Sequence, residues 1–400
     1  MLRIIILTVL VLVILGPACY ATVPQSVISE EAIQKIKSEP GQSWLKGLEE
    51  SRARFAEKYG TSFAFIFYYD QQLILAAKHD KGKGRGLCYW NLELIQQLWP
   101  GGSITGEMEI DRGRGVDKYL PTFSGFDTNS GENLDLYVPE LYLQQNFSRD
   151  KVYLAAGKLD LSDWFDDSAV AASGDTQFVS DSLINNLTIP FPSKGLGALA
   201  TFKLYDWLYF QPGAATAKAV SSKTGLSNGF NSTLFLAEVG LTPKFGKLQG
   251  NYRFIYHLTH EKLDFIDESR TKNNTAGFAL SFDQAFTERL TLFMRYGFAN
   301  AKVNSIAYFW SAGGQITEPL PGRKYDCLGI AVAESILGKD YRDYNGENTA
   351  YSETFWELYY SWDLNHIFTI TPHLQIVSNP NADKSASTEV VAGVRLLCLF

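Results

Sequence analysis

The sequence contains little methionine, histidine and cysteine. Among its 400 residues there are 3 Met, 5 His and 4 Cys. No two cysteines form a Cys-x-x-Cys motif and none lies in a Cys/His cluster, which excludes a zinc-binding module and a disulfide framework. His257 and His260 are three residues apart, a spacing that does not place them on one face of a strand. We therefore predict neither a metal site nor a cofactor.

Charge and hydropathy exclude two further classes of protein. The net charge of −7 at pH 7 argues against nucleic acid as a partner. The mean hydropathy of −0.10 is too low for a bundle of membrane-spanning helices.

Aromatic residues, in contrast, are plentiful. They make up 14% of the chain, with 26 Phe and 21 Tyr. Phe and Tyr favour strands, and Tyr is enriched where lipid meets water. This composition favours one large all-β body in contact with a membrane.

The first residues have the three-part pattern of a secretory signal peptide. Arg3 supplies a positive charge, residues 4–15 form an unbroken apolar run, and small residues follow. We predict a signal peptide over residues 1–21, with cleavage after Ala18 or Ala21. A membrane anchor is the alternative, but the run is short for a span of about 20 residues. Cys19 leaves lipoprotein processing as a further alternative.

Residues 22–60 differ in residue pattern from the rest of the chain. Helix-like stretches occupy 30–37 and 44–59, and Pro40-Gly41 separates them. We predict a short helical segment on the periplasmic side, followed by a barrel over residues 61–400.

From residue 61 onward, stretches of about ten residues alternate between apolar and polar side chains, as in a transmembrane barrel. In 103–111, for example, Ile104, Met108 and Ile110 oppose Thr105, Glu107, Glu109 and Asp111. A soluble β-sandwich also alternates, but here the apolar faces often end in aromatic residues, as an interfacial belt requires. The predicted fold class is therefore an all-β transmembrane antiparallel barrel.

The predicted strands number about sixteen, an even number, as a single-chain barrel needs. They cover 61–76, 86–98, 102–112, 134–147, 150–160, 195–204, 207–217, 232–242, 246–258, 274–284, 289–300, 303–311, 325–334, 351–363, 366–377 and 387–400. Short and long links alternate, as periplasmic turns and external loops do. One link, 312–324, is long where a tight turn is expected. The last strand ends on Phe400, which resembles the signal read by the barrel-assembly machinery.

Several motifs resemble the carbohydrate-selective porins of the OprB type. They are Pro139-Glu140-Leu141-Tyr142-Leu143-Gln144-Gln145, Gly157-Lys158-Leu159-Asp160, Asp163-Trp164-Phe165-Asp166, Gln177-Phe178, Asn185-Asn186, Pro190-Phe191-Pro192, Trp356-Glu357-Leu358-Tyr359-Tyr360 and the stretch 372–380. The match extends from about residue 44 to 400, although His373 stands where an acidic residue is expected. The resemblance implies a sixteen-stranded barrel with inward-folded external loops, in the outer membrane of a Gram-negative bacterium, that passes sugars.

We predict that the inward loop 161–194, helped by the loop 113–133, forms the neck of the channel against charged walls. The candidate pathway residues are Glu107, Glu109, Asp111, Glu140, Lys158, Asp160, Trp164, Phe165, Arg253 and Arg295. Opposed acidic and basic walls would set a transverse field across a pore. Wall charges that pair with one another are an equally good interpretation. Trp164 and Phe165 either stack on sugar rings or pin their loop to the barrel wall.

No residue pattern predicts an enzyme. Carboxylates two apart on one strand are neighbours on a wall, and they do not flank a substrate as a catalytic pair does. Lys81-Gly82-Lys83-Gly84-Arg85-Gly86 lacks the helix that follows a phosphate-binding loop, and it suits an exposed tip near lipopolysaccharide. The predicted function is passive diffusion of small hydrophilic solutes, with mono- or oligosaccharides as the expected substrates. A general porin, a barrel adhesin or enzyme, and a soluble secreted β-protein are the alternatives.

Overall fold

The computed structural model describes residues 43–131, 133–148, 150–223, 232–365 and 367–400. The predicted signal peptide, both cleavage positions and the helix expected at 30–37 lie outside these residues. No helix in the described ranges is long and apolar enough to cross a membrane.

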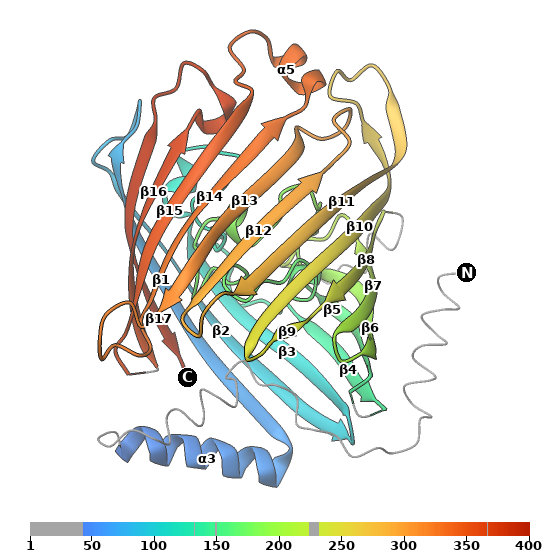
Figure 1. The fold of residues 1–400 in the computed structure, drawn as a ribbon, viewed down its shortest axis with the longest axis vertical. Coiled ribbons are helices and arrows are strands. Elements are labelled where there is room, and N and C mark those ends of the chain that lie inside the picture. Colours follow the sequence, from blue (N-terminus) through green and yellow to red (C-terminus); the bar gives the residue numbers. More distant parts are fainter. Residues whose placement is uncertain (1–42, 132, 149, 224–231, 366) are drawn as a thin grey trace.

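The described chain forms one closed antiparallel barrel (Figure 1). Its strands are β1 (Thr61–Ala76), β2 (Gly84–Trp99), β3 (Gly102–Gly113), β4 (Leu141–Phe147), β5 (Val152–Leu159), β6 (Gly195–Tyr205), β7 (Leu208–Thr216), β8 (Thr233–Leu241), β9 (Lys244–Phe245), β10 (Leu248–Asp264), β11 (Thr271–Ala285), β12 (Leu290–Phe298), β13 (Ile306–Thr317), β14 (Cys327–Leu337), β15 (Ser352–Asp363), β16 (Phe368–Ser378) and β17 (Glu389–Leu399). The two-residue β9 pairs with the same strand, β10, as β8 does, and therefore does not count as a separate wall strand. The wall thus has the sixteen strands predicted.

Closure joins the first strand to the last. β1 pairs with β17 from Ile66 opposite Leu399 onward, and it pairs with β2 on its other side. A closed barrel leaves no strand with unpaired backbone groups, which is the condition for crossing a lipid bilayer with strands.

Alternation along each strand separates two faces, as the sequence pattern predicts. On β12, Leu292 and Met294 are 41% and 48% exposed on the outer face, whereas Phe293 and Arg295 are buried on the inner face. On β10, Phe254 and Tyr256 face outward and Arg253 is buried. The outer apolar residues form the lipid-facing surface, because a barrel in a membrane buries that face in lipid.

Three strand boundaries differ from the sequence prediction. β13 continues to Thr317, through the stretch 312–317 that was assigned to a long link, and this shortens the following turn. β10 continues to Asp264, six residues beyond the predicted end. The predicted strand 134–147 begins only at Leu141, because residues 134–140 bond to β3 irregularly, with one β-bridge at Tyr137 and isolated hydrogen bonds at Leu134 and Glu140.

Two long links fold into the barrel (Figure 1). The β3–β4 link contains η1 (Gly115–Lys118), and the β5–β6 link contains η2 (Leu161–Asp163) and α4 (Asp181–Ile184). Phe126 and Phe178 from these links pack against the inward-facing Phe293 and Phe355 of the wall. The barrel interior therefore has a hydrophobic core of its own on one side. The remaining helical pieces are α5 (Lys339–Asn345) and η3 (Pro380–Ala382).

The helix α3 (Ser43–Tyr59) lies at the barrel end where the chain terminates (Figure 1). Arg52 donates a hydrogen bond to the carbonyl of Phe63, at the start of β1. Its guanidinium carbon also lies 5.3 Å from the ring centroid of Phe63 and 5.0 Å from that of Phe400. The helix therefore contacts both the first strand and the C-terminal residue.

Candidate pore constriction

The β5–β6 link is held in the barrel by a buried arginine of β12. The Arg295 side chain forms an ion pair with Asp166 at 3.0 Å and donates to the carbonyls of Leu183, Asp166 and Ala171 at 2.6 to 2.9 Å. All three acceptors belong to the link. Burying a charge is tolerated only where it is paired and hydrogen-bonded, so this arginine is committed to holding the loop.

Neighbouring strands hold both links in the same way. On β15, the Glu357 carboxylate accepts hydrogen bonds from the backbone amides of Val179 and Ser180 at 2.7 and 3.0 Å. Glu353, also on β15, accepts from two amides of the β3–β4 link at 2.9 and 3.0 Å. On β17, Arg395 donates to two carbonyls of the β5–β6 link at 2.7 and 3.0 Å. The wall from β12 to β17 therefore anchors the inward loops.

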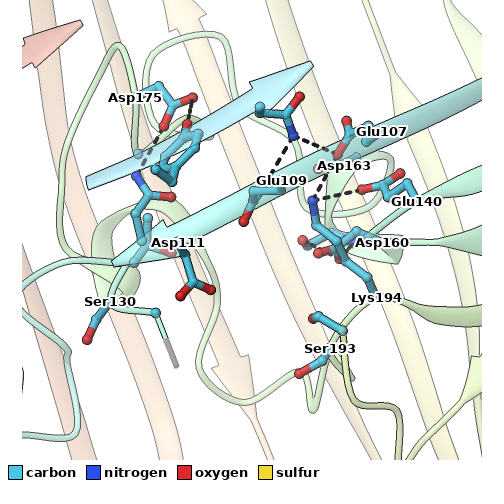
Figure 2. Close-up of a pocket in the computed structure, with 18 of the residues that line it drawn as sticks. Glu107, Glu109, Asp111, Ser130, Glu140, Asp160, Asp163, Asp175, Ser193 and Lys194 are labelled. Atoms are coloured by element: carbon cyan, nitrogen blue, oxygen red, sulfur yellow. Dashed lines mark hydrogen bonds and ion pairs between the residues drawn. The ribbon is translucent and has the colours of Figure 1, made fainter. Parts of the chain in front are cut away.

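Opposite these anchors, a cavity of about 750 Å³ remains between the loops and the strands β1 to β3. Its lining comes from the inner face of these strands, from both long links and from the start of the β7–β8 link. Figure 2 shows Glu107, Glu109 and Asp111 in a row on one strand, with Glu140, Asp160, Asp163 and Lys194 nearby. The loop side contributes small polar residues, among them Ser130 and Ser173.

Hydrogen bonds connect the polar groups on the strand side of the cavity. Asn91 on β2 donates from its amide nitrogen to Glu107 at 3.1 Å and to Glu109 at 3.2 Å. The Tyr137 hydroxyl donates to Glu109 at 2.5 Å. Lys194, which directly precedes β6, forms ion pairs with Glu140 at 3.1 Å and with Glu107 at 3.4 Å.

Glu140 and Lys194 lie outside the strands and are among the cavity residues whose pKa values are shifted. Burial raises the pKa of Glu140 to about 7, against the opposing effect of Lys194. Desolvation lowers the pKa of Lys194, but the neighbouring carboxylates of Glu107 and Glu140 more than offset this and raise it well above its usual range. Lys194 is therefore charged at any physiological pH, whereas Glu140 titrates near neutrality.

The structure brings five of the candidate residues together at this cavity. Glu107, Glu109, Asp111, Glu140 and Asp160 all line it. Asp160 also accepts a hydrogen bond from the amide of Ser162 at 3.0 Å, which caps η2 where the chain turns inward.

The two candidate arginines are elsewhere and are engaged by other groups. Arg295 is fully buried among the loop carbonyls described above. Arg253 forms an ion pair with Asp283 of the adjacent strand at 3.0 Å, and both side chains are buried. Neither lines the cavity, so the expected basic wall facing an acidic wall is absent there. Pairing within the protein, the alternative interpretation, describes both arginines.

Lys158 points to the outer face of the barrel, which corrects its expected place in the lumen. It stands opposite Leu141 in the β4–β5 register, and Leu141 is 49% exposed on the outer face. The Lys158 ammonium donates to the carbonyl of Val138 at 2.6 Å and to that of Ser221. Its neighbour Leu159 takes the inward position, because successive side chains of a strand alternate.

Trp164 and Phe165 lie against the wall and do not line the cavity. Phe165 is 1% exposed, packed in a cluster with Leu159 and Leu199. Gly213 on β7 leaves room for it, since a Cβ there would come within 2.8 Å of the Phe165 ring. The Trp164 ring packs edge-on against Tyr142 with centroids 5.4 Å apart. These contacts fit the loop-pinning role, and the expectation that Phe165 meets the solute is wrong for this conformation.

Several lining residues were not among the sequence candidates: Tyr89, Asn91, Tyr137, Asp163, Asp175 and Lys194. Tyr89 and Asn91 stand opposite Asp111 and Glu109 in the β2–β3 register, so alternation along β2 could have identified them. Lys194 comes from a loop without strand periodicity. Its place at the cavity follows only from the path of that loop.

A closed sixteen-stranded barrel with inward-folded loops beside a polar cavity is the architecture of a bacterial porin. The chain belongs to the carbohydrate-selective porin OprB family, whose family model matches residues 88–400. It is therefore an outer-membrane porin for carbohydrates. Family and fold are those of a channel rather than of an enzyme.

Solved structures share the fold at low sequence identity. The OprB of Pseudomonas putida in its high pH structure is 16% identical, with a TM-score of 0.76 over 88% of this chain and 96% of that one. Its low pH structure is 15% identical, with a TM-score of 0.60 over 91% and 100% of the two chains. The outer membrane channel DcaP of Acinetobacter baumannii is 12% identical, with a TM-score of 0.54 over 85% and 97%. A comparison with curated protein sequences gives no match.

Proposed function

We propose that sugars diffuse down their gradient through the 750 Å³ cavity between the β1–β3 wall and the two inward loops. The observation that supports this route is its lining, which is rich in carboxylates, amides and hydroxyls. Groups of this kind exchange hydrogen bonds with sugar hydroxyls. On the β12–β17 side, inward charges are occupied by loop backbone.

Glu107, Glu109, Asp111 and Asp160 are assigned the role of hydroxyl acceptors along this route. Tyr89 and Tyr137 are the aromatic side chains among its described lining residues, so we transfer to them the stacking role first considered for Trp164. Each such contact is weak. That suits a channel, because conduction requires that the solute leave as easily as it enters.

Filling the cavity tests the route. Ala172 lines the cavity and is exposed, and its backbone amide, rather than its side chain, makes its hydrogen bond to the loop. Ala172→Trp should slow glucose entry in a liposome-swelling assay, while the small Ala172→Ser variant should behave like the wild type. Swelling rates unchanged by tryptophan would place the route elsewhere. Equal wild-type rates for sugars and amino acids of matched size would instead identify a general porin.

Two further partners are proposed, one for the C-terminal strand and one for the turn between β1 and β2. We propose that the barrel-assembly machinery recognises β17 and Phe400, which close the barrel against β1. We propose that the Lys81–Arg85 turn contacts lipopolysaccharide, although Lys83 already pairs with Asp80 and Arg85 stacks on the Tyr119 ring at 4.2 Å. We also propose that residues 22–60 lie in the periplasm after removal of a signal peptide.

A further inference from the structure

The cavity lining carries many acidic groups and one basic group. Seven lining residues have a carboxyl group, and Lys194 alone among the described lining residues has a positive charge. The carboxyl groups belong to Glu107, Glu109, Asp111, Glu140, Asp160, Asp163 and Asp175. Arg253, Arg295 and Arg395 also face inward, but ion pairs and loop carbonyls hold them away from the cavity.

Asn91 gives a second, independent indication of what the lining accepts. The residue is 6% exposed, and its amide nitrogen is used by Glu107 and Glu109. Its side-chain oxygen has no hydrogen-bond partner within the described part of the chain. A buried oxygen without a partner needs a donor, and a hydroxyl, an ammonium or a hydrated cation can provide one whereas a carboxylate or phosphate group cannot.

Lys194 limits the negative charge at one point only. Its two ion pairs lie on the β3–β4 wall, at Glu107 and Glu140. Asp111 and Asp175 form hydrogen bonds instead, with the Leu134 amide at 2.6 Å and with the Tyr89 hydroxyl at 2.5 Å. A hydrogen bond from an amide or hydroxyl leaves the carboxylate charge in place. A narrow cleft lined by one sign of charge then repels ions of that sign and concentrates the opposite ones.

We propose that the cavity selects its solutes by charge, passing neutral and amino sugars and rejecting sugars that carry a carboxylate or phosphate group, with Lys194 limiting the preference for cations. The proposal rests on the proposed function, because the solutes must pass through this cavity. It adds a class of substrate and a residue that sets the selectivity.

Ion selectivity in planar bilayers tests the field directly. Under a KCl gradient centred near 0.1 M at pH 8, the wild-type reversal potential should show a several-fold preference for K⁺ over Cl⁻. Burial raises the pKa of Glu140 to about 7. The measurement is made at pH 8, above this pKa, so that Glu140 is mostly ionised. The preference should shrink near 1 M salt, where the screening length falls from about 10 Å to about 3 Å. A non-selective or Cl⁻-preferring wild type at 0.1 M would overturn the proposal.

Single charge changes assign the effect to the cavity. Glu109→Gln should lower the K⁺ preference, and Lys194→Gln should raise it, while Lys194→Arg should match the wild type. Asp135→Asn is the control, because Asp135 is an acidic residue of the β3–β4 link whose side chain is 96% exposed and lies outside the lining. Equal shifts for Glu109→Gln and Asp135→Asn would contradict a selective field in the cavity. Glu109→Gln also keeps the test decisive if a Lys194 variant fails to fold.

Liposome swelling with three sugars of similar ring size completes the test. Glucosamine and glucose should enter several-fold faster than glucuronate, and Glu109→Gln should narrow the gap. Equal rates for glucose and glucuronate would overturn charge selection. The Ala172→Trp variant separates the two proposals. If it blocks glucose while the charge variants leave selectivity unchanged, only the charge inference fails. If it blocks nothing, the proposed route itself is wrong.

Discussion

Two parts of the inner wall carry the same kinds of residue and use them differently. On β12 to β17, Arg295, Glu357 and Arg395 are almost completely buried beneath loop backbone. On β3, Glu107 and Glu109 face an open cavity and keep part of their surface exposed. An inward charge on a barrel strand therefore becomes an anchor or a lumen group according to whether a loop covers it.

The difference has an energetic basis. Each anchor exchanges its hydration for two or more hydrogen bonds to the loops, so the loops cannot leave without exposing unpaired amides and carbonyls to a buried charge. In the cavity, Glu107 and Glu109 keep part of their surface exposed, and their carboxylates bond to the side chains of Asn91, Tyr137 and Lys194. The comparison predicts that anchor variants should change the shape of the pore, whereas cavity variants should change only its selectivity.

Loss of an anchor should give the largest effect. Arg295→Met removes one partner of a buried ion pair, leaving the Asp166 carboxylate without its cation and three loop carbonyls without this donor, which costs about 3–5 kcal/mol. We expect the β5–β6 link to detach from the wall, and single-channel conductance and protease cleavage within the link both to rise. Glu109→Gln, the matched change in the cavity, should leave the conductance and the cleavage pattern close to wild type. Equal behaviour of the two variants would remove the distinction between the walls.

The outer and inner faces of the barrel wall provide the next comparison. Leu358 is 42% exposed on the outer face, one residue from the buried anchor Glu357. Leu358→Arg should impair insertion by about 2–4 kcal/mol near the bilayer centre, because the charge must enter lipid. Thr291→Arg, on the inner face of β12, should be tolerated better. Folding yields in lipid vesicles measure both, and equal yields would show that the facing assignment is wrong.

The sequence was sufficient to predict the barrel, because alternation and link length depend on local pattern alone. Sixteen strands, the outward Leu292 and the inward Glu107 could all be inferred this way. The roles of inward residues could not be inferred, since they depend on where two long loops pass. The same alternation that correctly placed Arg295 on the inner face gave no indication that a loop would cover it.

Lys158 shows a different limit of sequence reasoning. The residue belongs to a matched motif, and its charge favoured the lumen. Register with Leu141 places it on the outer face, where loop carbonyls near the end of β5 satisfy it. A charge on the outer face is possible there because the long side chain reaches polar backbone outside the hydrocarbon region.

The contact of α3 with the closing strand should matter less than the anchors. Arg52→Ala removes two cation–π contacts, with Phe63 and Phe400, each of about 0.5–1 kcal/mol, and the hydrogen bond to the Phe63 carbonyl. We expect the barrel to unfold at a slightly lower temperature in a heat-modifiable gel assay. Arg54→Ala is the matched control, because within the described part of the chain Arg54 bonds inside the helix, to Ser51 at 3.2 Å. A lower unfolding temperature for both variants would point to loss of helicity rather than loss of the seam contact.

The smallest expected effect concerns Tyr137 and decides whether its ring or its hydroxyl serves the solute. Tyr137→Phe removes the hydrogen bond to Glu109, worth about 0.5–1.5 kcal/mol, but keeps the ring in the cavity. Because stacking needs only the ring, glucose swelling rates should stay near wild type. Tyr137→Leu removes the aromatic face and should lower the rate for glucose more than that for an amino acid of matched size. If Tyr137→Phe instead slows glucose as much as Tyr137→Leu does, the hydroxyl and its carboxylate partner form the sugar contact, and the cavity acts through hydrogen bonds without stacking.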